Sequence, residues 1–71
     1  MDKKFIDMMA DILEVDEAEL SHETVFREVV DFDSLCSLST IAAMDDLYGR
    51  NLSADELETV TTLGDLFRLV S

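Results

Sequence analysis

The first hydrophobic pattern along the chain spans residues 2–14. Its apolar side chains recur at intervals of three and four residues, as they do along one face of a helix: Phe5, Ile6, Met9, Ile12 and Leu13. This spacing predicts an amphipathic helix over residues 2–14, with the apolar face turned toward a core.

Residues 15–33 show no comparable period and are predicted to form a long connecting loop. Asp16 is followed three residues later by Glu19, a spacing that favours a short helical turn. The apolar residues of the loop are expected to fix it to the core: Val15, Leu20, Val25, Phe26, Val29 and Phe32. Loops of this length are uncommon in compact domains and are often functional.

A second long helix is predicted from Ser34 to about Tyr48. Asp33 precedes it and can act as the N-cap, because a side-chain oxygen at this position accepts a bond from the first turn. Gly49 follows it, where helices commonly end in the left-handed conformation.

Two capping patterns predict the remaining helices. Ser53 with Glu56 marks the start of a short helix, and Thr62 with Asp65 marks the start of the last one. We therefore expect one domain over residues 1–71. Its fold is an all-α bundle of three main helices and one short helix, with a long loop after the first helix.

The helix over residues 34–48 carries two separate apolar groups. At about 100° per residue, one side gathers the residues that we expect to be buried: Ser37, Thr40, Ile41, Met44, Leu47 and Tyr48. Leu35, Leu38 and Ala42 lie well away from that side, and their neighbours on the helix are Ser34, Asp45 and Asp46. A surface helix needs only one apolar stripe, so the second group predicts a docking surface. The alternative is that Leu35 and Leu38 pack beneath the 15–33 loop.

Composition narrows the classes of partner. Seventeen acidic residues against five basic ones give a net charge of -12, which disfavours binding to nucleic acid or anionic lipid and favours proteins with basic surfaces. No apolar run has the length of a signal peptide or a membrane span. We expect a cytoplasmic protein that does not insert into membranes, and a monomer is the simplest expectation.

Ser34 is the residue with the most suggestive chemistry. At the start of a helix, free N–H groups and the positive end of the helix dipole would stabilise a phosphate esterified to its hydroxyl. Asp33 beside it caps the helix and is a candidate for positioning an incoming enzyme. An Asp-Ser-Leu triplet is unspecific by itself, because capping alone explains it.

The longer pattern resembles the acyl carrier proteins. Asp33-Ser34-Leu35 opens a helix, Ala43-Met44-Asp45-Asp46-Leu47-Tyr48-Gly49 ends it, and Thr61-Thr62-Leu63-Gly64-Asp65-Leu66 follows. The resemblance covers essentially the whole chain, including its length, acidity and helix order. It implies that a phosphopantetheinyl transferase attaches 4′-phosphopantetheine from coenzyme A to Ser34, and that the thiol of this arm carries acyl groups as thioesters.

The resemblance also implies a partner surface. In the family the second helix faces partner enzymes, which here places Leu35, Leu38, Ala42, Asp45 and Asp46 toward acyl-transferring and chain-elongating enzymes with basic surfaces. Leu52 is a lesser candidate for the same surface. The chain departs from the family pattern at Phe32, where glycine is frequent, and at Cys36 and Ser39, where acids are common. These departures leave both a fatty-acid carrier and a specialised, polyketide-like carrier open.

Enzymatic chemistry finds little support in the sequence. The only histidine, His22, falls in the long loop, so neither Ser34 nor the single cysteine, Cys36, has an evident base. One cysteine and one histidine exclude a zinc site of the usual kind, and no metal site is predicted. The rivals to an acyl carrier are an aminoacyl or peptidyl carrier and an unmodified acidic interaction module.

Overall fold

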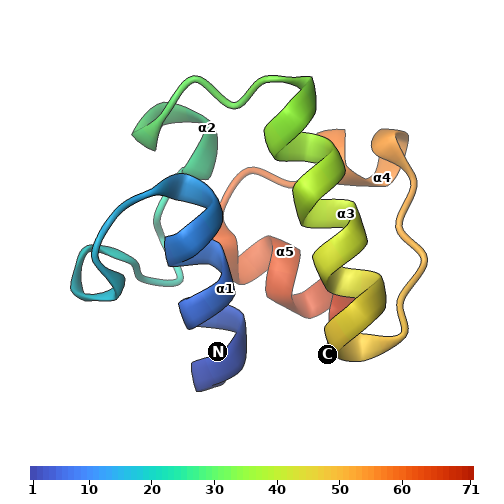
Figure 1. Ribbon diagram of the computed structural model, residues 1–71, viewed down its shortest axis with the longest axis horizontal. Helices are drawn as coiled ribbons and strands as arrows, with labels where there is room; N and C mark the ends of the chain where they lie inside the picture. Colours follow the sequence, from blue (N-terminus) through green and yellow to red (C-terminus); the bar gives the residue numbers. More distant parts are fainter.

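The computed structural model describes residues 1–71 and contains only helices and loops. Three long helices form the frame: α1 (Lys3–Leu13), α3 (Ser34–Tyr48) and α5 (Leu63–Val70). In Figure 1, α5 lies between α1 and α3, while α4 (Ala54–Glu58) lies beside the upper half of α3. The predicted all-α fold with three main helices is confirmed.

The long loop contains more structure than the sequence pattern indicated. A single 3-10 turn, η1 (Glu17–Glu19), forms where the Asp16–Glu19 spacing predicted one. A second short helix, α2 (Phe26–Val29), was not predicted. The fold therefore has two short helices, and one of them lies inside the connection between α1 and α3 (Figure 1).

Caps fix the ends of the helices. Asp2, which the sequence pattern did not indicate as a cap, accepts a hydrogen bond from the backbone N–H of Phe5 at 3.1 Å, and Gly49 ends α3 in the left-handed conformation, as predicted. Both predicted capping boxes form, at Ser53 with Glu56 and at Thr62 with Asp65. Local sequence therefore determines where α3, α4 and α5 begin.

The core collects apolar side chains from every α-helix and from the connections around α4. Its buried members are Phe5, Met9, Leu13, Phe26, Met44, Leu52, Leu57, Val60, Leu63, Leu66 and Val70. At one end of the core an edge-on aromatic pair joins α1 to α5, with ring centroids 5.1 Å apart for Phe5 and Phe67.

Backbone bonds tie the long loop to the start of α5. The N–H of Gly64 donates to the carbonyl of His22 at 3.0 Å, and the N–H of Leu63 donates to that of Thr24 at 2.9 Å. A Cβ atom at position 64 would lie 2.9 Å from the His22 carbonyl oxygen, closer than real contacts allow. Glycine at this position therefore permits the two segments to meet.

Arg27 holds α2 against the opposite side of the fold. Its guanidinium donates to the backbone carbonyls of Leu57 at 2.6 Å and Val60 at 2.5 Å, and it lies over the ring of Phe26 at 4.7 Å. These carbonyls belong to the end of α4 and the residues after it, which a cationic side chain can satisfy. The cation thus connects elements that are remote in sequence.

Most of the loop's apolar residues contact the core as expected. Val15, Leu20 and Phe32 are half-buried against it, and Val25 forms an isolated bridge with Thr62. Val29 is an exception, because its side chain is 39% exposed at the end of α2. The prediction that Val29 would anchor the loop was wrong. No helix combines the length and the apolar character that crossing a bilayer requires.

Candidate functional site

Ser34 is the first residue of α3, and its side chain is exposed. The Asp33 carboxylate accepts a hydrogen bond from the N–H of Cys36 at 3.0 Å, which confirms its role as N-cap. The same bond stabilises the charged carboxylate and lowers the pKa of Asp33. The predicted placement of an open hydroxyl at a capped helix start is therefore what the fold produces.

The surroundings of Ser34 suit a phosphodiester. The residue sits at the positive end of a 15-residue helix, where first-turn N–H groups and the helix dipole favour an anion. The side chain of Ser34 is exposed, and the cap bond at this helix start is made by Asp33 and the Cys36 N–H rather than by the serine hydroxyl. The residues present thus fit a phosphate group attached at this oxygen.

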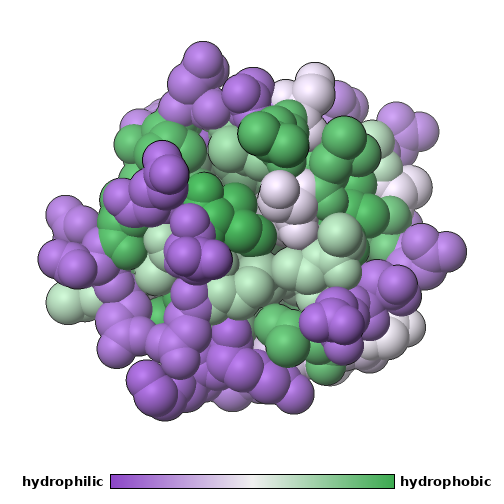
Figure 2. All heavy atoms as spheres, in the orientation of Figure 1, coloured by the Kyte–Doolittle hydropathy of each residue, from purple (hydrophilic) through white to green (hydrophobic).

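The second apolar group of α3 faces solvent. Leu35 is 71% exposed and Leu38 is 64% exposed, and Ala42 is exposed on the same helix. The alternative, in which the 15–33 loop covers the two leucines, was wrong. Figure 2 shows apolar side chains gathered over the upper part of α3, with hydrophilic ones around them. Exposed side chains of this size on one helix are typical of a contact surface.

The opposite side of α3 faces the core. Thr40 and Met44 are fully buried, and the other predicted members are half-buried: Ser37, Ile41, Leu47 and Tyr48. Thr40 satisfies its hydroxyl by donating to the Cys36 carbonyl at 2.8 Å. The predicted division of α3 into an inner and an outer side is confirmed.

The acidic residues and Leu52 differ in where they lie. Asp45 and Asp46 are exposed near the C-terminal end of α3, as a charged edge to the outer side requires. Leu52 is only 4% exposed and belongs to the core cluster. Leu52 packs inward because its apolar side chain is buried among the core residues, so we exclude it from the contact surface.

Cys36 and His22 do not form a nucleophile and base. Cys36 is half-buried; burial, and secondarily its contact with Asp33, raises the pKa of its thiol. A raised pKa opposes formation of the reactive thiolate. His22 is held in the loop before α2, where its ring lies 3.3 Å from the amino terminus of Met1. The two side chains lie in separate parts of the fold.

A cleft beside Ser34 was not foreseen from the sequence. It has a volume of about 630 Å³ and separates the C-terminal turn of α1 from the first turns of α3. Its lining comprises Asp11, Ile12, Leu13, Glu14, Val30, Asp31, Asp33, Leu35, Cys36 and Ser39. Asp33 and Leu35, the two neighbours of Ser34 in the chain, line the cleft, whereas Ser34 itself does not.

Glu14, which lines the cleft, also marks the end of α1. It adopts the left-handed conformation with φ of 58°. A glycine is usual in that conformation, so the pattern of apolar residues gave no signal for it. The sequence pattern therefore did not indicate this end of α1.

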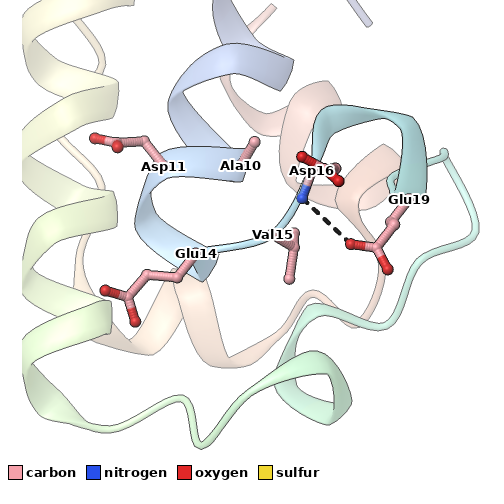
Figure 3. A pocket seen from close by; sticks show the side chains of 6 residues that line it. All are labelled: Ala10, Asp11, Glu14, Val15, Asp16 and Glu19. Atoms are coloured by element: carbon pink, nitrogen blue, oxygen red, sulfur yellow. Dashed lines mark hydrogen bonds between the residues drawn. The ribbon is translucent and has the colours of Figure 1, made fainter.

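A second, more open and acidic cleft lies on the other side of the end of α1. It has a volume of about 620 Å³ and is lined by Ala10, Asp11, Glu14, Val15, Asp16 and Glu19. Figure 3 shows Asp11 and Glu14 pointing toward α3, while Asp16 and Glu19 lie on the opposite side, where the Asp16 N–H donates to Glu19 at 3.2 Å. Asp11 and Glu14 therefore stand between the two clefts.

Comparison with known proteins identifies the family. The phosphopantetheine attachment site family matches residues 3–70. Polyketide-8 synthase acyl carrier protein 2 of Streptomyces avermitilis is 32% identical over 65 residues, which cover 92% of this chain and 75% of that protein. The acyl carrier protein of Lactobacillus acidophilus is 34% identical over 62 residues, covering 87% of this chain and 78% of that protein.

A third relative agrees with these two. The acyl carrier protein of Rubrobacter xylanophilus is 34% identical over 61 residues, covering 86% of this chain and 75% of that protein. No solved structure gave a significant match. The fold and the site define a helical carrier domain rather than an enzyme. The chain belongs to the acyl carrier protein family, and its cofactor is 4′-phosphopantetheine.

Proposed function

We propose that Ser34 is the residue to which 4′-phosphopantetheine is attached. The observation that carries this proposal is the exposed hydroxyl at the capped N-terminus of α3. When bound, the arm supplies a thiol that holds acyl groups as thioesters. The chain's own contribution is to hold the phosphate at the positive helix end, where Asp33 keeps the first turn in place.

Intact-mass measurement tests the attachment site. The purified chain is incubated with coenzyme A, magnesium and a phosphopantetheinyl transferase of broad specificity. We expect one phosphopantetheine adduct in the wild type and in Ser39→Ala, and none in Ser34→Ala. An adduct that persists in Ser34→Ala would contradict the assignment. Absence of any adduct, while a control carrier is loaded, would favour the unmodified interaction module.

We propose further that the outer side of α3 is the surface presented to the transferase and to acyl-handling enzymes. Leu35, Leu38 and Ala42 supply apolar contact, and Asp45 and Asp46 supply charge matched to basic partners. Exposed ion pairs are individually weak, yet several together guide the encounter between partners.

A charge-reversal pair tests the acidic edge. Asp45→Lys with Asp46→Lys is expected to lower kcat/KM for loading by about tenfold while helicity is unchanged. The matched control, Asp55→Lys with Glu58→Lys, changes the net charge equally on α4. Equal losses for both double variants would show that total charge alone matters. Unchanged kinetics for the α3 variant would remove the acidic edge from the surface.

The cargo is proposed to be an acyl intermediate of fatty-acid or polyketide-like biosynthesis in the cytoplasm. Similarity to carriers named for both settings supports this class. The loaded chain is offered malonyl-coenzyme A with an acyltransferase and, separately, amino acids with ATP and an adenylating enzyme. Malonylation of the arm supports the proposal. Aminoacylation without malonylation would identify a peptidyl-type carrier instead.

A further inference from the structure

The first turn of α3 carries Ser34 but contributes no fully buried side chain to the core. In α3 only Thr40 and Met44 are buried, and both come more than one helical turn after Ser34. Leu35 is 71% exposed, and Cys36 is half-buried. Packing of α3 on the core therefore holds the middle of the helix more firmly than its start, and the position of the first turn depends on the residues that precede it.

The segment just before Ser34 is anchored by Phe32. Its half-buried ring packs edge-on against the fully buried Phe26, with ring centroids 5.0 Å apart. The N–H of Asp33 donates to the carbonyl of Asp31 at 2.9 Å, so the backbone makes a tight turn at Phe32. In Figure 1 this connection leads directly from α2 into the upper end of α3. A ring that packs on the core is thus joined to the attachment residue through Asp33 alone.

Arg27 fastens this aromatic pair to another part of the fold. Its guanidinium carbon lies 4.7 Å from the ring centroid of Phe26 and 5.8 Å from the ring centroid of Phe32. The same group donates to the backbone carbonyls of Leu57 at 2.6 Å and Val60 at 2.5 Å. A planar guanidinium can lie over rings and donate from its edge at the same time, which an ammonium group cannot do. One side chain thus links the segment before α3 to the end of α4.

We propose that Phe32 and Arg27 are positioning residues for the attachment of 4′-phosphopantetheine to Ser34. They act through the backbone of Asp33, by holding the start of α3 against the end of α4. During loading the serine oxygen bonds to the phosphorus next to the pantetheine arm of coenzyme A, the adenosine bisphosphate leaves, and the transferase accepts the serine proton. A displacement of about 1 Å between reacting groups can slow such a step by about a hundredfold. This inference rests on attachment at Ser34.

Loading kinetics of two matched variants test the proposal. Phe32→Leu removes a half-buried ring from the pair with Phe26, and Phe67→Leu removes a half-buried ring from the pair with Phe5, which joins α1 to α5. We expect Phe32→Leu to lower kcat at least about tenfold and to change KM by less than about twofold, because the outer side of α3 still binds the transferase. Phe67→Leu should leave both constants close to those of the wild type.

Two further variants separate positioning from a general loss of stability. Phe32→Tyr keeps the ring at a half-exposed position and should restore kcat to within about twofold of the wild type. Arg27→Lys keeps the charge but loses the paired donation and the stacking, so it should lower kcat in the same direction as Phe32→Leu. Every variant is assayed well below its own melting temperature, where circular dichroism shows it to be folded.

A structural readout on the unloaded protein completes the test. The NMR order parameters of the Ser34 and Leu35 amides should fall in Phe32→Leu and stay unchanged in Phe67→Leu. The proposal requires both this result and the loss of kcat.

Equal kcat losses in Phe32→Leu and Phe67→Leu, or an unchanged kcat in Phe32→Leu, would overturn the positioning role and leave the attachment site in place. A higher KM at constant kcat would also overturn it, because the ring would then belong to the docking surface. Failure of the wild type to gain the arm at Ser34, measured by intact mass, would overturn the attachment site itself.

Discussion

Helices α5 and α3 use their apolar residues in different ways. In α5 the large side chains point mainly to one side, where Leu63, Leu66 and Val70 are buried. In α3 they occur on opposite sides, and Leu35 and Leu38 stay in solvent while Met44 is buried. A helix that serves only the core needs one apolar face. The core therefore does not need the second face of α3, which supports the contact surface that we propose there.

Replacing one leucine by alanine in each helix should show the largest difference between the core-forming face of α5 and the outer side of α3. Leu66→Ala in α5 removes a fully buried side chain and should lower the free energy of unfolding by about 2–5 kcal/mol. Leu38→Ala on the outer side of α3 should change it by less than about 0.5 kcal/mol. Urea denaturation followed by circular dichroism measures both values. A large loss for Leu38→Ala would place that leucine in the fold rather than on a contact surface.

In a kinetic assay, substitutions at the same two positions should show the opposite order of effects. Leu38→Ala is expected to lower kcat/KM for transferase loading by about tenfold, as truncation of an apolar contact residue commonly does. For α5 the gentler change Leu66→Val keeps the domain folded and should leave loading kinetics nearly unchanged. Equal kinetic effects from both variants would mean that stability, and not contact, governs loading.

A smaller effect concerns the inner side of α3. Tyr48 donates a hydrogen bond to the Asp2 carboxylate at 2.7 Å, and this bond lowers the pKa of Asp2 below its ordinary value of 3.8. A carboxyl group whose pKa is lower in the folded state than in the unfolded state stabilises the fold at pH values above its unfolded-state pKa. This contribution is lost as the pH falls through the folded-state pKa. The excess stability of wild type over Asp2→Asn should therefore shrink below about pH 4.

Thermal melts across that acidic range measure the difference between wild type and Asp2→Asn. Tyr48→Phe should remove most of the same pH dependence, because it deletes the donor while keeping the ring that contacts Phe5. A stability difference that is constant from neutral to acid pH would show that the bond to Tyr48 does not set the pKa.

Added salt should stabilise the folded domain but slow its association with a basic partner. The net charge is -12, and the excess carboxylates repel one another in the compact state. Added salt or magnesium screens this repulsion and should raise the melting temperature by a few degrees. Screening should also weaken attraction between Asp45, Asp46 and a basic partner, which lowers the rate of association. A melting temperature that is independent of salt would contradict the first half of this prediction.

The parts of the fold that the sequence predicted are those set by local chemistry. Asp33 and Gly49 bound α3 because a side-chain cap and a left-handed glycine act within a few residues. Helix α2 was missed because four residues carry no period, and its position depends on Arg27 reaching carbonyls of Leu57 and Val60 more than 25 residues away. Long-range bonds of this kind leave no local pattern.

The candidate site shows the same limit. The geometry at Ser34 and the outer side of α3 follow from helical spacing alone, so both could be predicted. The burial of Leu52 and the cleft beside Ser34 depend on how segments that are distant in the sequence pack against one another. Periodicity identifies which residues share a face, whereas it does not show how two elements are spaced.

The contact between Gly64 and His22 bears on the order in which the molecule assembles. It joins segments separated by more than half of the chain, and the bonds from Arg27 to Leu57 and Val60 join the same loop to the residues that precede α5. Pairing between segments so far apart is expected to form more slowly than local helices. We therefore expect the 15–33 segment to reach its native position after α1 and α3 have formed, an order that pulse-labelling hydrogen exchange during refolding would measure.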